Sequence, residues 1–192
     1  PLCMPDGTVW VTQSGTRDNK SETPLYRIAP DGAREAIAVE ISNPTSLALG
    51  PDDAVYVSSR FEGIVYRVRE RGAAEVFATE LGVATGLAFG PDGALYVGDR
   101  SGTVFRLAPE GDHKAEVFAS LPPSVAAFHL AMGPDGWLYV SVPTLASRDV
   151  IYRISPEREV QTWCTAFGRP QGLAFDARGT LFVAEALAGA AG

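Results

Sequence analysis

His129 is the residue of this sequence best suited to proton transfer. An imidazole ring changes its charge near neutral pH, so a histidine can act as a general base or bind a metal ion. His129 enters an apolar segment directly after Phe128, whereas His113 follows Asp112 in a polar stretch and is expected in a solvated turn. The alternative for His129 is a structural role, in which its ring hydrogen-bonds a neighbouring backbone group.

Asp99 and Glu185 are two further candidates, because each ends an apolar segment at the same place in a recurring phrase. Two carboxylates that meet at one opening can bind a cation or take part in acid–base chemistry, and a raised pKa would mark such a role. The alternative is that each carboxylate binds the backbone of a neighbouring loop. For Asp99, the adjacent Arg100 is also available as an ion-pair partner.

The segments that carry these residues belong to an internal repeat. One phrase, written GPDGALYVG from Gly90 and DARGTLFVA from Asp176, occurs five times, with starts 40 to 46 residues apart. An apolar run precedes each copy, and the copy itself begins with a turn of the Pro-Asp-Gly type and ends with a second apolar run. Proline presets φ at the first central position of a turn, and glycine accepts the positive φ that other residues resist. Each copy therefore predicts a β-hairpin.

Two outer strands follow each of the first four hairpins. Phrases such as TVFRL from Thr103 and AEVFA from Ala115 alternate apolar side chains with Arg or Glu, while the hairpin strands are apolar at nearly every position. Four short strands in a period of about 40 to 50 residues are typical of a β-propeller blade. The arginines that recur in the third strands are expected to face solvent; they are Arg27, Arg67, Arg106 and Arg153.

The predicted fold class is therefore all-β, a single β-propeller of four-stranded antiparallel blades. Long helices are excluded, because no sustained 3.6-residue apolar period occurs and because Gly or Pro interrupts the chain often. The sequence holds about four and a half blades. They are expected to span approximately residues 1–42, 43–82, 83–124 and 125–168, with a partial blade at 169–192.

Composition narrows the choice of partners. The sequence has 16 Lys and Arg against 23 Asp and Glu, and its formal net charge of -7 has the wrong sign for binding nucleic acid or an anionic membrane surface. No apolar run approaches the ~20 residues that span a bilayer. Cys3 and Cys164 lie far apart and cannot form a disulfide framework. We expect neither nucleic acid nor a membrane as partner, and the sequence assigns no compartment.

Phrases such as GLAFGPDGALYVGD and GLAFDARGTLFVAE resemble the six-bladed propellers of the regucalcin and gluconolactonase superfamily, and more loosely the NHL-repeat and strictosidine-synthase-like proteins. The likeness runs over the whole chain, and the sequence lacks the GH and WD dipeptides of WD-repeat blades. A ring of six blades at this period would take about 250 residues. The resemblance therefore implies an incomplete propeller that either belongs to a longer polypeptide or associates with a second copy.

The resemblance also implies where a metal would bind. In the lactonase members a divalent cation, commonly calcium, is held by a Glu, two Asn and an Asp, and the Asp is taken as the general base. By position, the two Asn fall on Thr85 and Phe128 and the Asp falls on Gln171, while the Glu would lie before Pro1. Phe has no oxygen ligand and neutral Gln cannot act as a base, so this metal site is expected to be absent or rebuilt, with its ligands unassigned.

Three functions stay open on this scaffold. The first is a hydrolase of a lactone or related small ester, with Ca²⁺ as the possible cofactor and the small-molecule ligand at the mouth of the central channel. The second is a non-catalytic binding propeller of the NHL type, and the third is a metal-independent lyase or strictosidine-synthase-like enzyme. His129 and Glu185 are the predicted catalytic residues, and the predicted ligand-binding residues are Thr85, Phe128, Gln171, Asp99 and Arg100.

Overall fold

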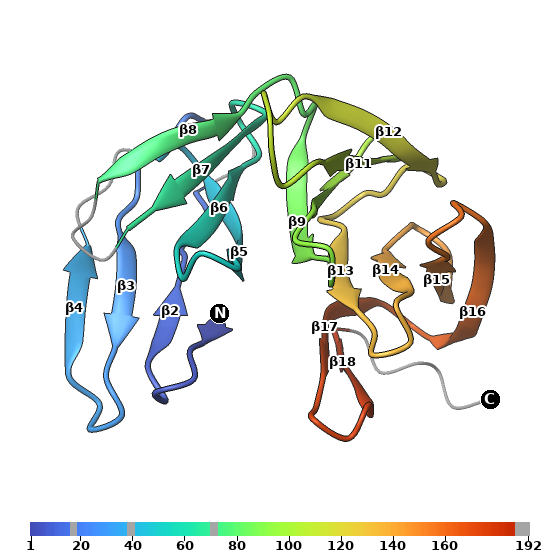
Figure 1. Cartoon of the computed structure of the whole chain (residues 1–192). Coiled ribbons are helices and arrows are strands. Elements are labelled where there is room, and N and C mark those ends of the chain that lie inside the picture. The colour runs from blue at the N-terminus through green and yellow to red at the C-terminus, as the bar shows by residue number, and fades with distance from the viewer. Residues whose placement is uncertain (16–18, 38–40, 70–72, 187–192) are drawn as a thin grey trace.

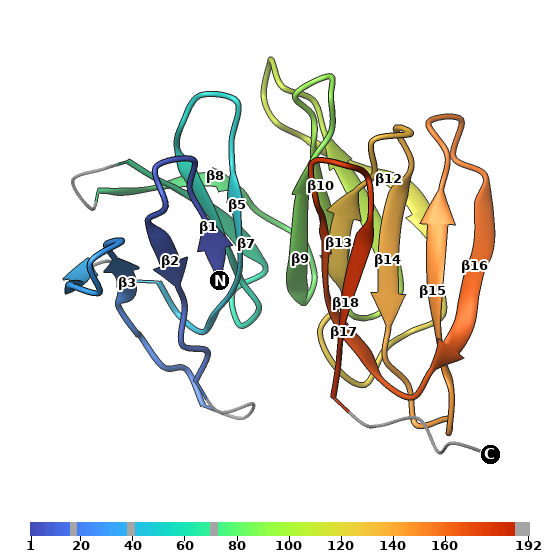
Figure 2. The same ribbon diagram turned by 90° about the horizontal axis from the view of Figure 1, so that it is seen from below.

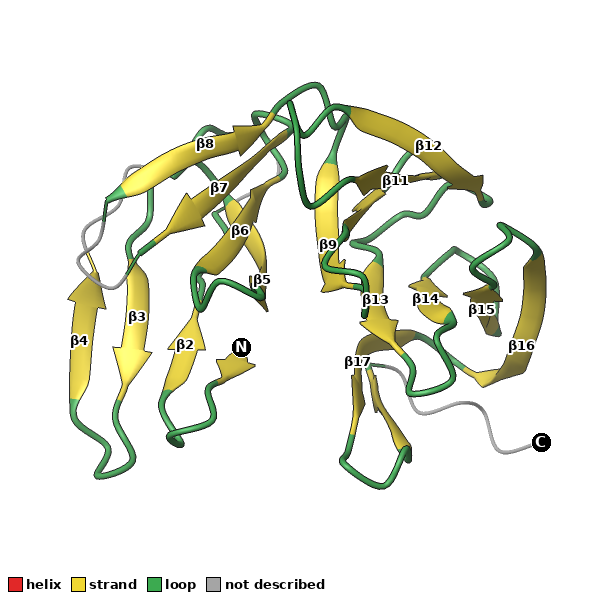
Figure 3. Cartoon of the chain, viewed as in Figure 1, coloured by secondary structure: helices red, strands yellow, loops and turns green. Residues whose placement is uncertain are grey.

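The computed structural model describes residues 1–15, 19–37, 41–69 and 73–186, and strands joined by turns and loops make up this part of the chain (Figure 3). The predicted all-β fold is confirmed. β-Branched and aromatic residues fill the strands, where they suit a pleated and buried surface, and Gly and Pro gather in the connections. The described residues contain no helix that could cross a membrane.

The strands form four-stranded antiparallel sheets, in which neighbours in the sheet are also neighbours in the sequence. Blade 1 consists of β1 (Leu2–Cys3), β2 (Val9–Val11), β3 (Leu25–Ile28) and β4 (Arg34–Ile37). Blade 2 consists of β5 (Pro44–Leu49), β6 (Val55–Ser59), β7 (Ile64–Val68) and β8 (Ala74–Ala78). Blade 3 consists of β9 (Ala84–Phe89), β10 (Leu95–Asp99), β11 (Thr103–Leu107) and β12 (Ala115–Ser120). Blade 4 consists of β13 (His129–Met132), β14 (Leu138–Val142), β15 (Asp149–Ile154) and β16 (Val160–Phe167). A hairpin of β17 (Pro170–Phe175) and β18 (Leu181–Glu185) follows, and we call it blade 5.

The blades fan out around an open arc, with the first strand of each sheet innermost (Figure 1). Strand β9 contacts both β5 and β13, and β13 contacts β17, so the innermost strands follow one another around a common axis (Figure 2). Because each sheet is an antiparallel meander, the loop that enters an innermost strand and the end of the next strand lie at the same end of this axis. We call that end the entry face.

The hairpin turns lie at the opposite end of the axis and form as predicted. In blade 3 the N–H of Gly93 donates to the carbonyl oxygen of Gly90 at 3.0 Å. Gly93 has a φ of 77°, a value that residues with a side chain rarely adopt. The carboxylate of Asp92 closes the turn by accepting the N–H of Ala94 at 3.1 Å.

The arginines of the third strands are partly shielded, which corrects the expectation that they only face solvent. Arg106 donates to the turn carboxylate of Asp92 at 2.6 Å, and Arg67 donates in the same way to Asp52. Burial alone would raise the pKa of Asp92, but the hydrogen bond from Arg106 lowers it below its ordinary value. Each pair therefore ties the third strand of a blade to the hairpin turn of the same blade.

The apolar core lies between blades, since both faces of an inner blade must be covered by its neighbours. Between blades 3 and 4 the buried cluster includes Phe118 and Phe128. The cluster between blades 2 and 3 includes Leu81 and Leu95, and a third, which includes Trp10, packs blade 1 on blade 2. This radial packing is what holds the entry-face residues in place.

Candidate functional site

Hydrogen bonds from serine side chains to backbone hold neighbouring blades together at the entry face. Ser58, near the end of β6, donates from Oγ to the carbonyl oxygen of Thr85 in β9 at 2.6 Å. Ser141, in β14, donates from Oγ to the carbonyl oxygen of Gln171 in β17 at 2.9 Å. Each bond joins the second strand of one blade to the innermost strand of the next, so the two bonds hold these neighbouring blades together beside the axis.

Thr85 joins three blades. Its side chain is 2% exposed, its carbonyl group accepts the bond from Ser58, and its Oγ1 donates to the carbonyl oxygen of Gly98 at 2.9 Å. The same Oγ1 accepts the N–H of Phe128 in blade 4 at 3.1 Å. Because the hydroxyl both donates and accepts within the protein, Thr85 holds the scaffold together and is not presented to a ligand.

Phe128 lies in the core rather than on the channel wall. Its side chain is fully buried, at 0% exposure, in the cluster between blades 3 and 4. Gly98 makes room for it, since a Cβ added there would lie 2.9 Å from the Cβ of Phe128. A ring enclosed in this way has no surface to offer to a substrate, so we leave Phe128 out of the proposed site.

His129 and Gln171 both lie at the junction of blades 4 and 5, where β13 contacts β17. His129 opens β13, and its Cα lies opposite that of Ser141, so both side chains project to the same face of the sheet. Ser141 in turn is bound to the backbone of Gln171. His129 and Gln171 are half-buried, and neither side chain forms a hydrogen bond with another described residue. Both side chains therefore keep their hydrogen-bonding capacity for a ligand.

Burial sets the charge of His129. It lowers the pKa of the imidazole below its ordinary value of 6.5, because a half-buried ring is less well solvated when it carries a charge. The ring is therefore neutral at pH 7 and can accept a proton. The backbone hydrogen bond that would make His129 purely structural is not formed by the described residues.

Asp99 holds a loop of its own blade. The side chain is 4% exposed, and its Oδ1 accepts the backbone N–H groups of Val83 at 2.9 Å and Ser101 at 3.0 Å. The hydroxyl of Ser101 also donates to this carboxylate. No ion pair joins Asp99 to Arg100 in the described part of the chain; instead the backbone N–H of Arg100 donates to the carbonyl oxygen of Val83 at 3.2 Å. These contacts match the loop-binding alternative for Asp99.

Glu185 acts in the same way in blade 5. Its Oε1 accepts the backbone N–H of Gly168, in the loop that enters β17, while the side chain stays exposed. Blade 4 separates Glu185 from Asp99, and each carboxylate is engaged by a loop next to its own strand. The geometry favours a positioning role for both acids over a shared catalytic pair.

The donors at the positions implied by the resemblance do not fit a calcium site. Thr85 uses its hydroxyl in the scaffold, Phe128 has no oxygen ligand, and Gln171 offers only a neutral amide. The described residues also contain no group of three or more His, Cys, Asp or Glu side chains that could hold a metal ion. We therefore derive no step through a metal.

Several cavities open between neighbouring blades. A cavity of about 370 Å³ opens at the outer rim between blades 2 and 3, where Phe77 and His113 line it. His113 lies in the turn between β11 and β12 as predicted, but it is only partly solvated, because its ring stacks on that of Phe77 with centroids 4.2 Å apart. Residue types alone do not predict this cavity. The uneven lengths of the repeats were the available signal.

Solved structures with the same fold include a lyase and a lactonase. Virginiamycin B lyase from Staphylococcus aureus matches 96% of this chain with a TM-score of 0.72 and 17% identity, over 61% of its own length. A gluconolactonase from Xanthomonas campestris matches 93% of the chain with a TM-score of 0.67 and 17% identity, over 68% of its length. Regucalcin, a calcium-binding protein from Agrobacterium tumefaciens, matches 84% with a TM-score of 0.64 and 15% identity, over 62% of its length. The fold is that of these propellers.

The resemblance predicted from the turn phrases is thus confirmed at the level of the propeller fold. No family model matches the sequence, and no curated protein matches it by sequence. Identities of 15 to 20% show a shared fold but do not show a shared activity. This propeller spans about three fifths of the length of the first structures it matches, so the activity of the whole protein is a matter for proposal.

Proposed function

We propose that this chain is part of a propeller enzyme that opens a lactone or a related cyclic ester bound beside the axis at the junction of blades 4 and 5. The observation that carries the proposal is His129, which is half-buried, neutral at pH 7 and without a hydrogen-bond partner among the described residues. A neutral imidazole near the operating pH is well suited to general-base catalysis. The likeness to gluconolactonases supports an ester substrate.

In the hydrolytic reaction His129 takes a proton from water as the water oxygen attacks the ester carbonyl carbon. The resulting imidazolium then returns the proton to the leaving alkoxide, and the ring opens with the addition of one water molecule. The amide of Gln171 can donate a hydrogen bond to the carbonyl oxygen, where negative charge develops. Glu185 contributes by holding the loop next to Gln171.

Elimination is the second candidate, and one comparison favours it. A catalytically inactive variant of virginiamycin B lyase from Staphylococcus aureus, in complex with quinupristin, carries alanine in place of a histidine, and it matches 96% of this chain with a TM-score of 0.63. In an elimination, His129 would take a proton from the carbon next to the breaking C–O bond. The carboxylate would leave, a C=C bond would form, and no water would be consumed.

Product mass and one matched pair of variants test these proposals. The protein is incubated with gluconolactone and with quinupristin, and mass spectrometry of the opened product shows whether one water has been added. We expect His129→Gln to lower turnover by about 10²- to 10⁴-fold, the usual contribution of a positioned base. His113→Gln, at the outer rim, should change turnover little. Full activity of His129→Gln would overturn the assignment, and inactivity of the folded wild type on both substrates would favour the non-catalytic binding propeller.

A further inference from the structure

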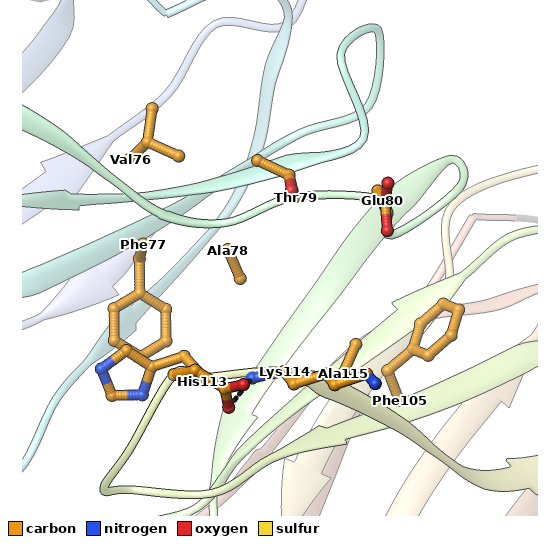
Figure 4. Close-up of a pocket in the computed structure, with 10 residues that line it drawn as sticks. Val76, Phe77, Ala78, Thr79, Glu80, Phe105, His113, Lys114 and Ala115 are labelled. Carbon is orange, nitrogen blue, oxygen red and sulfur yellow. Dashed lines mark hydrogen bonds between the residues drawn. The ribbon is translucent and has the colours of Figure 1, made fainter.

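The rim cavity between blades 2 and 3 has aromatic walls and acidic edges. Phe77 of β8 and Phe105 of β11 face its interior, and His113 stacks on Phe77 from the turn before β12 (Figure 4). Glu80 and Asp112 add carboxylates at its edge, and both are exposed. Its volume of about 370 Å³ is within the range of small-ligand sites. The cavity lies on the outer strands, far from the innermost strand that carries His129.

The next junction shows what such a place can hold, because the same phrase recurs there. Strand β12 repeats the AEVFA of β8, so Phe118 corresponds to Phe77. Arg158, from the turn before β16, lies over the ring of Phe118 with its Cζ 5.7 Å from the centroid. Its guanidinium donates to the carbonyl oxygen of Val117 at 3.2 Å and to the carboxylate of Glu116 at 3.5 Å. Between blades 3 and 4, the chain's own guanidinium occupies this place.

His113 stands where Arg158 stands, two residues before the outer strand begins, and both residues have a positive φ, of 51° and 72°. The imidazole of His113 is short, and its Nδ1 lies 3.2 Å from the carbonyl oxygen of Ala108 in its own turn. The carbonyl oxygen of Val76, which corresponds to that of Val117, accepts no side-chain donor from the described residues. His113 covers the ring of Phe77 with its own imidazole, with centroids 4.2 Å apart, but it gives the carbonyl group of Val76 no donor, so the guanidinium is missing.

Extra residues in the repeat supply the acidic edge. The turn between β11 and β12 runs over residues 108–114, whereas the turn between β15 and β16 runs over only 155–159. Ala78 and Leu81 are separated by one residue more than Ala119 and Leu121, although the N–H groups of both leucines make equivalent bonds to Gly63 and Gly102. The longer segments bring in Asp112 and Glu80, so the described residues that line the cavity have two carboxylates and one cation, Lys114.

We propose that the rim cavity binds an arginine side chain presented by a peptide segment of a partner protein. The guanidinium would lie in the cavity beside the stacked rings of His113 and Phe77 and donate to the carbonyl oxygen of Val76, with Glu80 and Asp112 as its counter-charges. A planar cation that packs beside aromatic rings and donates in a fork suits this set of groups better than an ammonium ion does. The overall charge of -7 also favours the approach of a basic segment.

A pair of peptides tests the proposal directly. The ¹⁵N-labelled protein is titrated with acetyl-Gly-Arg-Gly-amide and, as the matched neutral probe, with acetyl-Gly-citrulline-Gly-amide. We expect saturable shifts at the amides of Glu80 and His113 with the arginine peptide, with a Kd on the order of 1 mM, and none with the citrulline peptide. Equal shifts with both peptides, or no saturable shift at these amides, would overturn the proposal.

Substitutions of residues that line the cavity provide a second test of the proposed arginine site. His113→Arg places a guanidinium in the cavity from within, at a backbone conformation that Arg158 already adopts, and should weaken the arginine peptide at least about tenfold. The double variant Glu80→Gln, Asp112→Asn should weaken it about fivefold, and Glu110→Gln, in the same turn but outside the cavity, should leave it unchanged. All of these positions except His113 are exposed, so folding is not at risk. Unchanged affinity in both cavity variants would contradict the site.

Discussion

Thr85, Phe128 and Gln171 share one position of the repeat and yet lie in three different environments. The hydroxyl of Thr85 joins blades, the ring of Phe128 fills the core, and Gln171 stays half-buried at the next junction. One neighbouring residue accounts for much of the difference. Gly98 stands where blade 2 has Ser58, so blade 3 has no serine hydroxyl to bind blade 4, and Thr85 makes that connection while Phe128 packs against the glycine.

Replacing Gly98 should therefore destabilise the protein. In Gly98→Ala the new Cβ would lie 2.9 Å from both Phe128 Cβ and Leu130 Cδ1, so the core between blades 3 and 4 must shift. We expect a loss of about 1–3 kcal/mol in the free energy of unfolding, measured by urea denaturation. Gly172→Ala is the control, since its Cβ would have its nearest neighbour at 3.7 Å, an ordinary contact. Equal stability of the two variants would be inconsistent with this packing.

The lowered pKa of His129 predicts how stability depends on pH. The unfolded chain binds a proton at this ring as the pH falls through 6.5, whereas the folded protein resists protonation until a lower pH. The free energy of unfolding should therefore decrease as the pH falls below 6.5, by at most about 1.4 kcal/mol per pH unit from this one group. His129→Gln should remove this slope between pH 6.5 and 5, and His113→Gln should keep it. The same slope in both variants would assign it to other groups.

At the scale of the element, the ends of the second strands hold the loops of the entry face. Ser59 at the end of β6 donates to the carbonyl oxygen of Ser42 at 2.5 Å, Asp99 at the end of β10 accepts from Val83, and Glu185 at the end of β18 accepts from Gly168. The side chains differ because a carbonyl group needs a donor and an N–H group needs an acceptor. Variation at this position therefore reflects the partner in the loop as well as any ligand.

Asp99 provides the test at this scale. Asp99→Ala removes the acceptor for two backbone N–H groups in a buried place and should cost about 2–4 kcal/mol of unfolding free energy. Asp99→Asn keeps an oxygen in the position of Oδ1 and should cost less than half as much. Thermal and urea unfolding measure both variants. A ligand-binding role for Asp99 would instead leave stability unchanged in both and reduce turnover.

The hairpins and blades were predictable from sequence because their causes are local. The Pro-Asp-Gly turn sets its own backbone angles, and the apolar residues on both sides of it specify strands covered on both faces. The environments of the Thr85 and Phe128 side chains were not predictable, because they depend on which face of the next blade packs against them. The rim cavity is an intermediate case, since the longer turn at 108–114 is visible in the sequence but its stacking of His113 on Phe77 is not.

In the molecule as a whole, the described part of the chain forms an arc, and the blades at its two ends, blade 1 and blade 5, each lack a neighbour on one side (Figure 1). The chain covers 61% of the length of virginiamycin B lyase. Strand β18 pairs only with β17 among the described strands, and Phe182 on it is 61% exposed. Exposed apolar strands of this kind favour association with further polypeptide.

We therefore expect the isolated 192-residue polypeptide to self-associate. Size-exclusion chromatography with light scattering should give a mass above the 20.3 kDa of one chain, and Phe182→Lys should lower the associated fraction. Thr180→Lys, which adds the same charge at a position without an exposed aromatic ring, is the control. A monodisperse monomer of the unmodified polypeptide would contradict this expectation.

If His129 acts as a neutral base at the junction of blades 4 and 5, its protonation must set the pH dependence of kcat/KM for ester opening. We predict a rate that is constant above neutral pH and falls only at pH values below 6.5, the ordinary pKa of imidazole, with the same profile in His113→Gln. In His129→Gln the residual rate should lose this acid limb. An acid limb that persists unchanged without His129 would show that another group is the base.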